Sequence, residues 1–227
     1  MVGVNISMFK FFNREKRNYN RRYPEDYGFI RTLWITLFLW FVVWPAAFLW
    51  YTSKITGWNN IDRKKRYVYT SNHQSYIDAP LLSVIANAPV AYMAKKELYE
   101  HKNPLIRFLV ISLGAYSVDR ENPEKATLKT IIDIAKKTKW NLGMFPQGRQ
   151  ITEGEKFNDI KPGFVAIAKL AKMDIVPVAI CNFRGYTWIP FRKSKHLTLK
   201  VGKPISYELP EEEIVKQWVD YMKANVD

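Results

Sequence analysis

From residue 59 onward, short apolar runs alternate with stretches in which apolar residues recur every three or four positions. This alternation is typical of strands and helices that follow one another in an α/β domain. The runs that we interpret as strands are Tyr67–Thr70, Val90–Met93, Ala115–Val118, Leu142–Phe145, Ile175–Ile180 and Leu197–Val201. We therefore expect an α/β fold with a central mixed sheet flanked by helices.

Three helices are marked by start signals. Asn122-Pro123-Glu124 offers a cap, a first-turn proline and an acid ahead of a helical apolar pattern. A second helix is expected over Pro162–Lys172. A third begins at Pro210, where Glu211-Glu212-Glu213 places acids at the positive end of the helix. Its apolar stripe comprises Ile214, Val215, Trp218, Val219 and Met222.

The pattern differs at residues 32–51, a 20-residue stretch without a charged side chain. That length can cross a hydrocarbon core about 30 Å thick. The stretch starts too late and is too long to be a cleavable signal peptide. Both flanks are basic, because residues 1–31 carry seven Lys/Arg against three Asp/Glu and residues 52–66 carry five against one, which is +4 on each side. A spanning helix normally has its basic excess on one side only.

Pro45 is expected to break this helix in its second half. Tryptophan favours the headgroup level of a membrane, and four line the segment: Trp34, Trp40, Trp44 and Trp50. We therefore favour a segment that dips into one leaflet or lies on it, at the cytoplasmic face of the cell membrane. A single span is the alternative, and a buried core helix fits less well because nearly every face is apolar. We expect residues 1–58 to form a basic arm and this membrane-associating segment, and residues 59–227 to form the α/β domain.

Composition narrows the class of partner. With 227 residues, of which 48% are hydrophobic, the chain can bury one sizeable core. Its single cysteine, Cys181, excludes an intramolecular disulfide, and without zinc-ligand spacing we expect no metal site. The net charge of +14 suits nucleic acid, an anionic membrane, a phosphate-bearing substrate or an acidic carrier protein. Because the charge clusters beside the apolar segment and no nucleic-acid signature is present, we expect membrane lipids rather than nucleic acid as partners.

Candidate chemistry lies in the segment Ser71–Asp78, which sets His73 five positions before Asp78. This spacing is wrong for one face of a helix, and on a strand it points the two side chains to opposite faces. They meet only if the chain bends, which a strand end at Ser71 and a helix start at Ala79-Pro80 allow. Asp78 would then accept one ring N–H, leaving the other ring nitrogen as a general base. The plainer alternative is that Asp78 is a helix cap and His73 a turn residue.

Three later motifs suit an anionic substrate. Arg120 follows a strand and could bind a phosphate through its fork, or pair structurally with Asp119. Next comes Pro146-Gln147-Gly148-Arg149, in which a glycine allows close backbone approach and Arg149 adds charge. Lys161 stands before a helix whose free N–H groups favour an anion.

Taken in order, these segments resemble the four sequence blocks of the glycerolipid acyltransferase family, which includes the lysophosphatidic acid acyltransferases. The blocks are Asn72–Asp78, Val118-Asp119-Arg120, Phe145–Arg149 and the proline-bearing run Ile175–Ile180. The likeness covers roughly residues 58–203. The third block differs from the usual family sequence, which is Phe-Pro-Glu-Gly-Thr-Arg. Here Gln147 replaces the acid and the arginine comes one position early, which bears on the identity of the acceptor.

The resemblance implies direct acyl transfer from a thioester to a lysophospholipid hydroxyl, without a cofactor. His73 would be the base and Asp78 its orienting acid. Arg120, Arg149 and Lys161 would hold the acceptor phosphate, and the set that supports substrate and oxyanion would be Asn72, Ser75, Gln147 and Gly148. The donor would be acyl-CoA or acyl carrier protein, and the product of lysophosphatidic acid would be phosphatidic acid. Two alternatives to this function remain. The first is an acyltransferase for another lysophospholipid or a glycolipid acceptor, and the second is a non-catalytic basic membrane-binding protein. A serine hydrolase is disfavoured because no Gly-x-Ser-x-Gly elbow is present.

Overall fold

A computed structural model describes residues 22–47, 54–75, 77–118, 125–150, 157, 159–181 and 197–226. Within these residues, seven strands form one sheet with the order β1-β7-β6-β2-β5-β3-β4. Neighbouring strands are parallel except β6 and β7, which are antiparallel. The strands are β1 (Lys54–Thr56), β2 (Val68–Ser71), β3 (Val90–Lys95), β4 (Tyr116–Val118), β5 (Asn141–Met144), β6 (Ile175–Cys181) and β7 (Thr198–Val201). The expected mixed sheet is confirmed.

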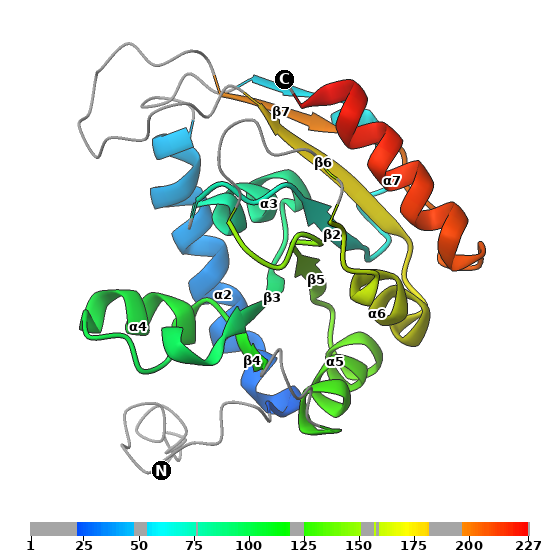
Figure 1. Cartoon of the computed structure of the whole chain (residues 1–227). Coiled ribbons are helices and arrows are strands. Elements are labelled where there is room, and N and C mark those ends of the chain that lie inside the picture. Colours follow the sequence, from blue (N-terminus) through cyan, green and yellow to red (C-terminus); the bar gives the residue numbers. More distant parts are fainter. Residues whose placement is uncertain are drawn as a thin grey trace, which may run out of the picture.

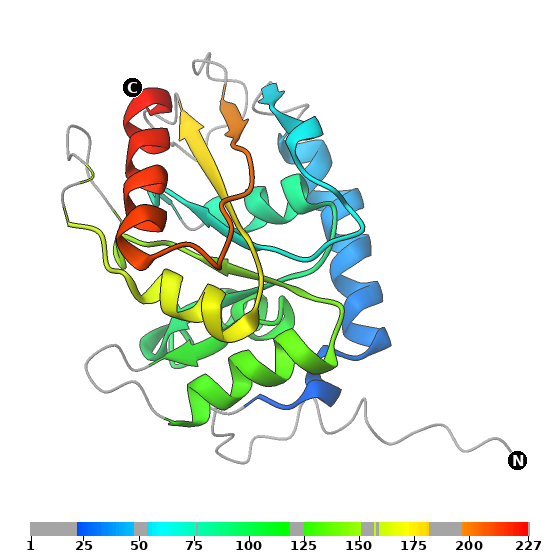
Figure 2. The ribbon, with the colours of Figure 1, turned by 90° about the vertical axis from the view of Figure 1, so that its right-hand side faces the viewer.

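Helices cover both faces of this sheet (Figures 1 and 2). On one side lie α5 (Lys125–Lys137), α6 (Gly163–Ala171) and α7 (Glu211–Asn225). On the other lie α2 (Phe29–Phe38), its π-helical continuation η2 (Leu39–Val43), α3 (Asp78–Ala86) and α4 (Pro104–Ser112). Short 3₁₀ turns, η1 (Pro24–Tyr27), η4 (Trp58–Asn60) and η5 (Lys96–Leu98), join these elements.

Strand β6 shows why the sheet lies at the centre of the core. All seven of its residues are buried, as expected for a strand covered on both faces. Val176, Val178 and Ile180 pack with the buried face of α3, whereas Ile175 and Ala179 pack with Trp218 and its neighbours. Trp218, in the predicted stripe of α7, donates its indole N–H to Thr70 Oγ1 at 2.8 Å. Cys181, at the end of this strand, is also buried.

The N-terminal helix packs along the domain through one narrow stripe. Its buried residues are spaced by four: Arg31, Ile35, Leu39, Val43 and Ala47. By length and composition, the helical stretch Pro24–Val43 could cross a membrane, with a mean hydropathy of 1.4, and only 28% of its apolar window is buried. The low burial separates it from the core helices of this fold.

The predicted helix break at Pro45 is wrong. Helical backbone continues from Phe29 to Ala47 and includes the π-helical segment Leu39–Val43. In an α-helix the proline ring at position 45 would clash with the carbonyl group of Phe41. Because Phe41 lies in the wider π segment, the helix accommodates the ring without ending.

One strand and one α-helix were not predicted from the sequence. Strand β1 pairs with β7 at the edge of the sheet, and α4 connects β3 to β4. Some predicted features lie outside the described residues: the arm before residue 22, Trp50 and the cap Asn122-Pro123-Glu124. The proposed division of the chain after residue 58 remains a prediction.

Candidate active site

The candidate site lies where two neighbouring parallel strands end. β2 pairs with β5 in the register Val68↔Leu142 to Thr70↔Met144. The segment that begins with Asn72 therefore leaves the sheet beside the segment that begins with Phe145. The carboxyl ends of parallel strands are the usual place for ligands in such sheets.

His73 and Asp78 meet at this edge. His73 Nδ1 lies 2.8 Å from Asp78 Oδ2. The same carboxylate oxygen accepts the backbone N–H groups of Gln74 at 2.6 Å and Ser75 at 2.7 Å. Asp78 is fully buried in the first turn of α3, where backbone N–H groups favour negative charge. The bend expected between strand and helix is therefore present, and it directs one ring nitrogen onto the acid.

The other ring nitrogen of His73, Nε2, is free to accept a proton. The side chain is 18% exposed, and Nε2 makes no hydrogen bond to any residue within the described ranges. When Nδ1 carries the proton that Asp78 accepts, Nε2 has a lone pair that can accept a proton from an alcohol. This is the tautomer that a general base requires.

An aromatic stack supports the imidazole from one side. The Phe145 ring lies 4.1 Å from the His73 ring, centroid to centroid, with planes 16° apart. Tyr92 stacks behind Phe145 at 6.3 Å, and its hydroxyl group lies 2.9 Å from Ser83 Oγ. Burial raises the pKa of Tyr92, so it stays a neutral phenol in this stack. This role of Phe145 was not predicted from the sequence, although the residue opens the third family block.

Gln147 links the turn that contains His73 to the loop that follows β5. Its Oε1 accepts the backbone N–H of His73 at 3.0 Å. The side chain is buried, and its Nε2 has no hydrogen-bond partner in the described part of the chain. A buried amide donor without a partner is rare in proteins, and a ligand oxygen that enters this edge of the sheet could supply the partner.

Asn72 and Ser75 hold the backbone of the turn. Asn72 is fully buried, donates from Nδ2 to the Ile180 carbonyl at 2.9 Å and accepts the Ile180 N–H at 2.8 Å. Asn72 therefore ties the turn to β6. Ser75 contributes the backbone N–H that binds Asp78, and its Oγ lies 3.5 Å from the Ile77 nitrogen.

The basic residues are placed unequally. Gly148 has a φ of +69°, donates its N–H to the Phe145 carbonyl at 2.9 Å and lies against the side chain of Lys161. Lys161 is exposed and donates its backbone N–H to the Pro146 carbonyl at 3.0 Å. Arg149 is also exposed, with Nη1 3.4 Å from the Gln150 carbonyl. Arg120 lies outside the described residues.

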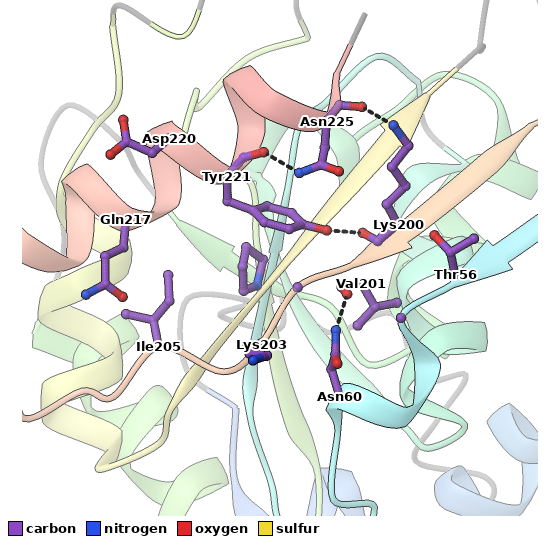
Figure 3. Close-up of a pocket in the computed structure, with 13 residues that line it drawn as sticks. Thr56, Asn60, Lys200, Val201, Lys203, Ile205, Gln217, Asp220, Tyr221 and Asn225 are labelled. Atoms are coloured by element: carbon purple, nitrogen blue, oxygen red, sulfur yellow. Dashed lines mark hydrogen bonds between the residues drawn. The ribbon is translucent and has the colours of Figure 1, made fainter.

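A pocket of about 530 Å³ elsewhere in the fold carries no acid–base pair (Figure 3). It lies between β7, α7 and the turn after β1, and its polar groups largely bind one another. Lys200 Nζ donates to the Asn225 carbonyl and Tyr221 OH to the Lys200 carbonyl, both at 2.9 Å. The edge that holds His73 and Asp78 therefore remains the candidate site.

Comparisons with known proteins identify the family of the chain. The family model described as Acyltransferase matches residues 52–181. The 1-acyl-sn-glycerol-3-phosphate acyltransferase of Streptococcus pneumoniae (strain R6) is 33% identical over 136 residues, which cover 57% of this chain and 48% of that protein. The Bacillus subtilis (strain 168) protein of the same name is 31% identical over 153 residues, which cover 67% of this chain and 73% of that protein.

Several other relatives are matched over about half of their length, including the Cocos nucifera protein at 52%. The fold is shared with the crystal structure of the 1-acyl-sn-glycerophosphate (LPA) acyltransferase PlsC from Thermotoga maritima. The TM-score is 0.56 at 23% identity, and the match covers 86% of this chain and 97% of that one. The family model includes the residues from His73 to Asp78 and the loop after β5. On these grounds the chain belongs to the acyltransferase family.

Proposed function

We propose that this protein transfers a fatty acyl group from a thioester donor to the free sn-2 hydroxyl of lysophosphatidic acid, giving phosphatidic acid. Family membership and the shared name of its relatives support this proposal. The observation that carries it is the 2.8 Å contact between His73 Nδ1 and Asp78 Oδ2, because that contact prepares Nε2 as a base.

This geometry supports the following reaction. His73 Nε2 takes the proton of the acceptor hydroxyl while its oxygen attacks the thioester carbonyl carbon. Asp78 holds the ring and stabilises the imidazolium that forms. The tetrahedral intermediate then expels the thiolate, the carbon–sulfur bond breaks, and the thiolate takes the proton from Nε2. Transfer is direct, so Ser75 has no covalent role and no cofactor takes part.

The developing oxyanion needs a hydrogen-bond donor in a site that excludes water. The Gly148 N–H is already used by the Phe145 carbonyl. Gln147 Nε2 is buried and has no partner within the described residues, so we assign this amide to the oxyanion. Its other end holds His73, and one side chain thus positions the base and the donor together.

The acceptor phosphate is assigned to Lys161 and Arg149, with Arg120 as a third cation by sequence. Lys161 lies against Gly148, one residue from Gln147, and is exposed to an incoming anion. Lysine supplies a point charge and arginine a planar fork, and both bind phosphate well. The donor is acyl-CoA or acyl carrier protein.

The protein is assigned to the cytoplasmic face of the cell membrane. The N-terminal helix follows the domain through a stripe that extends from Arg31 to Ala47. A helix that keeps these contacts lies along the domain and does not project away from it. This packing favours the in-plane arrangement over the single span.

Release of free thiol by purified protein tests this function. The assay compares acyl-CoA with acyl carrier protein as donors, and lysophosphatidic acid with other lysophospholipids as acceptors. Thiol release that depends on lysophosphatidic acid supports the proposal. Because Gln147 replaces the family acid, a second candidate is transfer to a different lysophospholipid, which a preference for another acceptor would favour. Binding to vesicles without thiol release from any pair would overturn both candidates.

A further inference from the structure

Helix α4 is mostly apolar, yet the fold covers it only in part. It comprises Pro-Leu-Ile-Arg-Phe-Leu-Val-Ile-Ser, and Ser112 is its only fully buried residue. Leu105 is 60% exposed and Phe108 39% exposed. Positions 105, 108 and 109 share one helix face, because residues three and four apart are neighbours on a helix. An apolar helix face left open to water calls for a partner.

This face continues the apolar surface of the N-terminal helix. The rings of Trp34 and Phe108 lie 6.4 Å apart, centroid to centroid, at 67°. Arg31 Nη1 donates to the Ile111 carbonyl at 3.2 Å, which ties α2 to the end of α4. Both helices lie on the same side of the molecule (Figure 1). The large apolar residues that this surface exposes are Phe29, Ile30, Leu33, Trp34, Leu37, Trp40, Phe41, Val42, Leu105 and Phe108. We call this surface the α2–α4 face.

The charges around α4 complement an anionic bilayer. Between the end of β3 and the middle of α4, the exposed cations are Lys95, Lys96, Lys102 and Arg107. The exposed acids are Glu97 and Glu100, so the excess is four minus two, or +2. Basic residues near an apolar surface attract the anionic headgroups of a membrane.

The position of α4 relates this face to the chemistry. It follows β3, which is parallel to β5 in the register Val90↔Asn141 to Tyr92↔Gly143. The chain therefore enters α4 from the same edge of the sheet at which His73 and Phe145 lie. A bilayer on the α2–α4 face would present lipid near the candidate active site.

We propose that α4 is a second membrane-contacting element, which joins α2 in docking the protein on an anionic bilayer. The proposal rests on the membrane-surface assignment under the proposed function. It adds an element outside the N-terminal segment and commits to lipid rather than to a second copy of the chain.

Flotation of the full chain with vesicles tests the proposal without any catalysis. The vesicles contain equal parts of phosphatidylglycerol and phosphatidylcholine. The variant Leu105→Gln/Phe108→Gln should bind at least about tenfold more weakly than the parent, since 1.4 kcal/mol corresponds to tenfold. The matched control is Leu128→Gln/Leu170→Gln, two leucines of α5 and α6 that are 44% and 38% exposed on the other side of the sheet. The control should bind like the parent.

Equal vesicle binding by Leu105→Gln/Phe108→Gln and the parent would overturn the proposal. Sedimentation tests whether a second copy of the chain covers the face instead. If the parent is a dimer and this variant is a monomer with unchanged vesicle binding, the face binds a second copy and the proposal is wrong. A polarity-sensitive dye on Leu105→Cys gives an independent reading, as Cys181 is buried and resists labelling. Its emission should shift to the blue with vesicles, and an unchanged emission contradicts lipid contact. Failure of the proposed function, by contrast, would appear as absent thiol release with normal vesicle binding.

Discussion

Gln147 accepts the backbone N–H of His73 through Oε1 at 3.0 Å, across 74 positions of sequence. The bond joins the turn after β2 to the turn after β5, so the pairing of these strands fixes where the imidazole stands. The glutamine thus replaces an acid of the family block while keeping an oxygen toward the histidine turn.

We therefore expect Gln147→Ala to lower both stability and turnover. Losing the acceptor leaves a partly buried N–H without a partner, which costs about 1–3 kcal/mol. Thermal unfolding and thiol release measure the two effects. Gln147→Glu keeps the oxygen that accepts the His73 N–H, so it should be more stable than the alanine variant. Its turnover should stay low, because a carboxylate has no N–H to donate to the oxyanion. Equal stability and turnover in Gln147→Ala and the parent would show that the bond has no role.

Asp78→Asn should lower kcat by about 10²-fold or more, because an amide cannot stabilise the imidazolium and does not enforce the tautomer. The amide oxygen can still accept from the backbone N–H groups of Gln74 and Ser75, so the fold should persist. Circular dichroism and steady-state kinetics with lysophosphatidic acid separate rate from folding. A kcat within twofold of the parent would show that Asp78 serves only as a helix cap.

Phe145→Leu should reduce kcat by about two- to tenfold, with little effect on KM. An aromatic pair contributes about 0.5–1.5 kcal/mol beyond the area that it buries, and here that contact orients the base. Phe145→Tyr keeps the stacked ring and is the matched control. If leucine and tyrosine gave the same kcat, the stack at 4.1 Å would only fill space.

Lys161→Ala should raise the KM for lysophosphatidic acid about tenfold while changing kcat little, since the lost charge binds the phosphate at a distance from the bond that reacts. Lys169, a lysine of the following helix that is also exposed, provides the control through Lys169→Ala. The measurement is KM with lysophosphatidic acid as the varied substrate. An unchanged KM in Lys161→Ala would remove Lys161 from the phosphate site.

The sequence predicted those elements whose pattern of apolar and polar residues is visible within a short stretch of the chain. In the segment from Ser71 to Asp78, the side chains of His73 and Asp78 can meet only if the chain bends between them. The structure has that bend. Strand β6 was predictable because its continuous apolar run is buried throughout, and α7 because its helical apolar stripe matches its buried residues. These cases depend on residues that are close in the chain.

The missed features depend on residues that are far apart, or on patterns without a period. The bond of Asn72 to Ile180 spans 108 positions and exists only because β2 pairs with β6. Helix α4 is apolar on nearly all sides, so its sequence has no inward face to detect. Strand β1 has three residues and lies at the sheet edge, which gives little pattern. The expected break at Pro45 failed because a π segment precedes it.

Turnover of His73→Ala tests the central claim most directly. The assay measures thiol release with lysophosphatidic acid, beside Ser75→Ala as a control that keeps the backbone N–H bound to Asp78. Removing a general base typically costs about 10²–10⁴-fold, so His73→Ala should lose at least about 10²-fold in kcat with an unchanged circular dichroism spectrum. Ser75→Ala should stay within a few fold of the parent. A folded His73→Ala that retained parental turnover would contradict the assignment of this imidazole as the base.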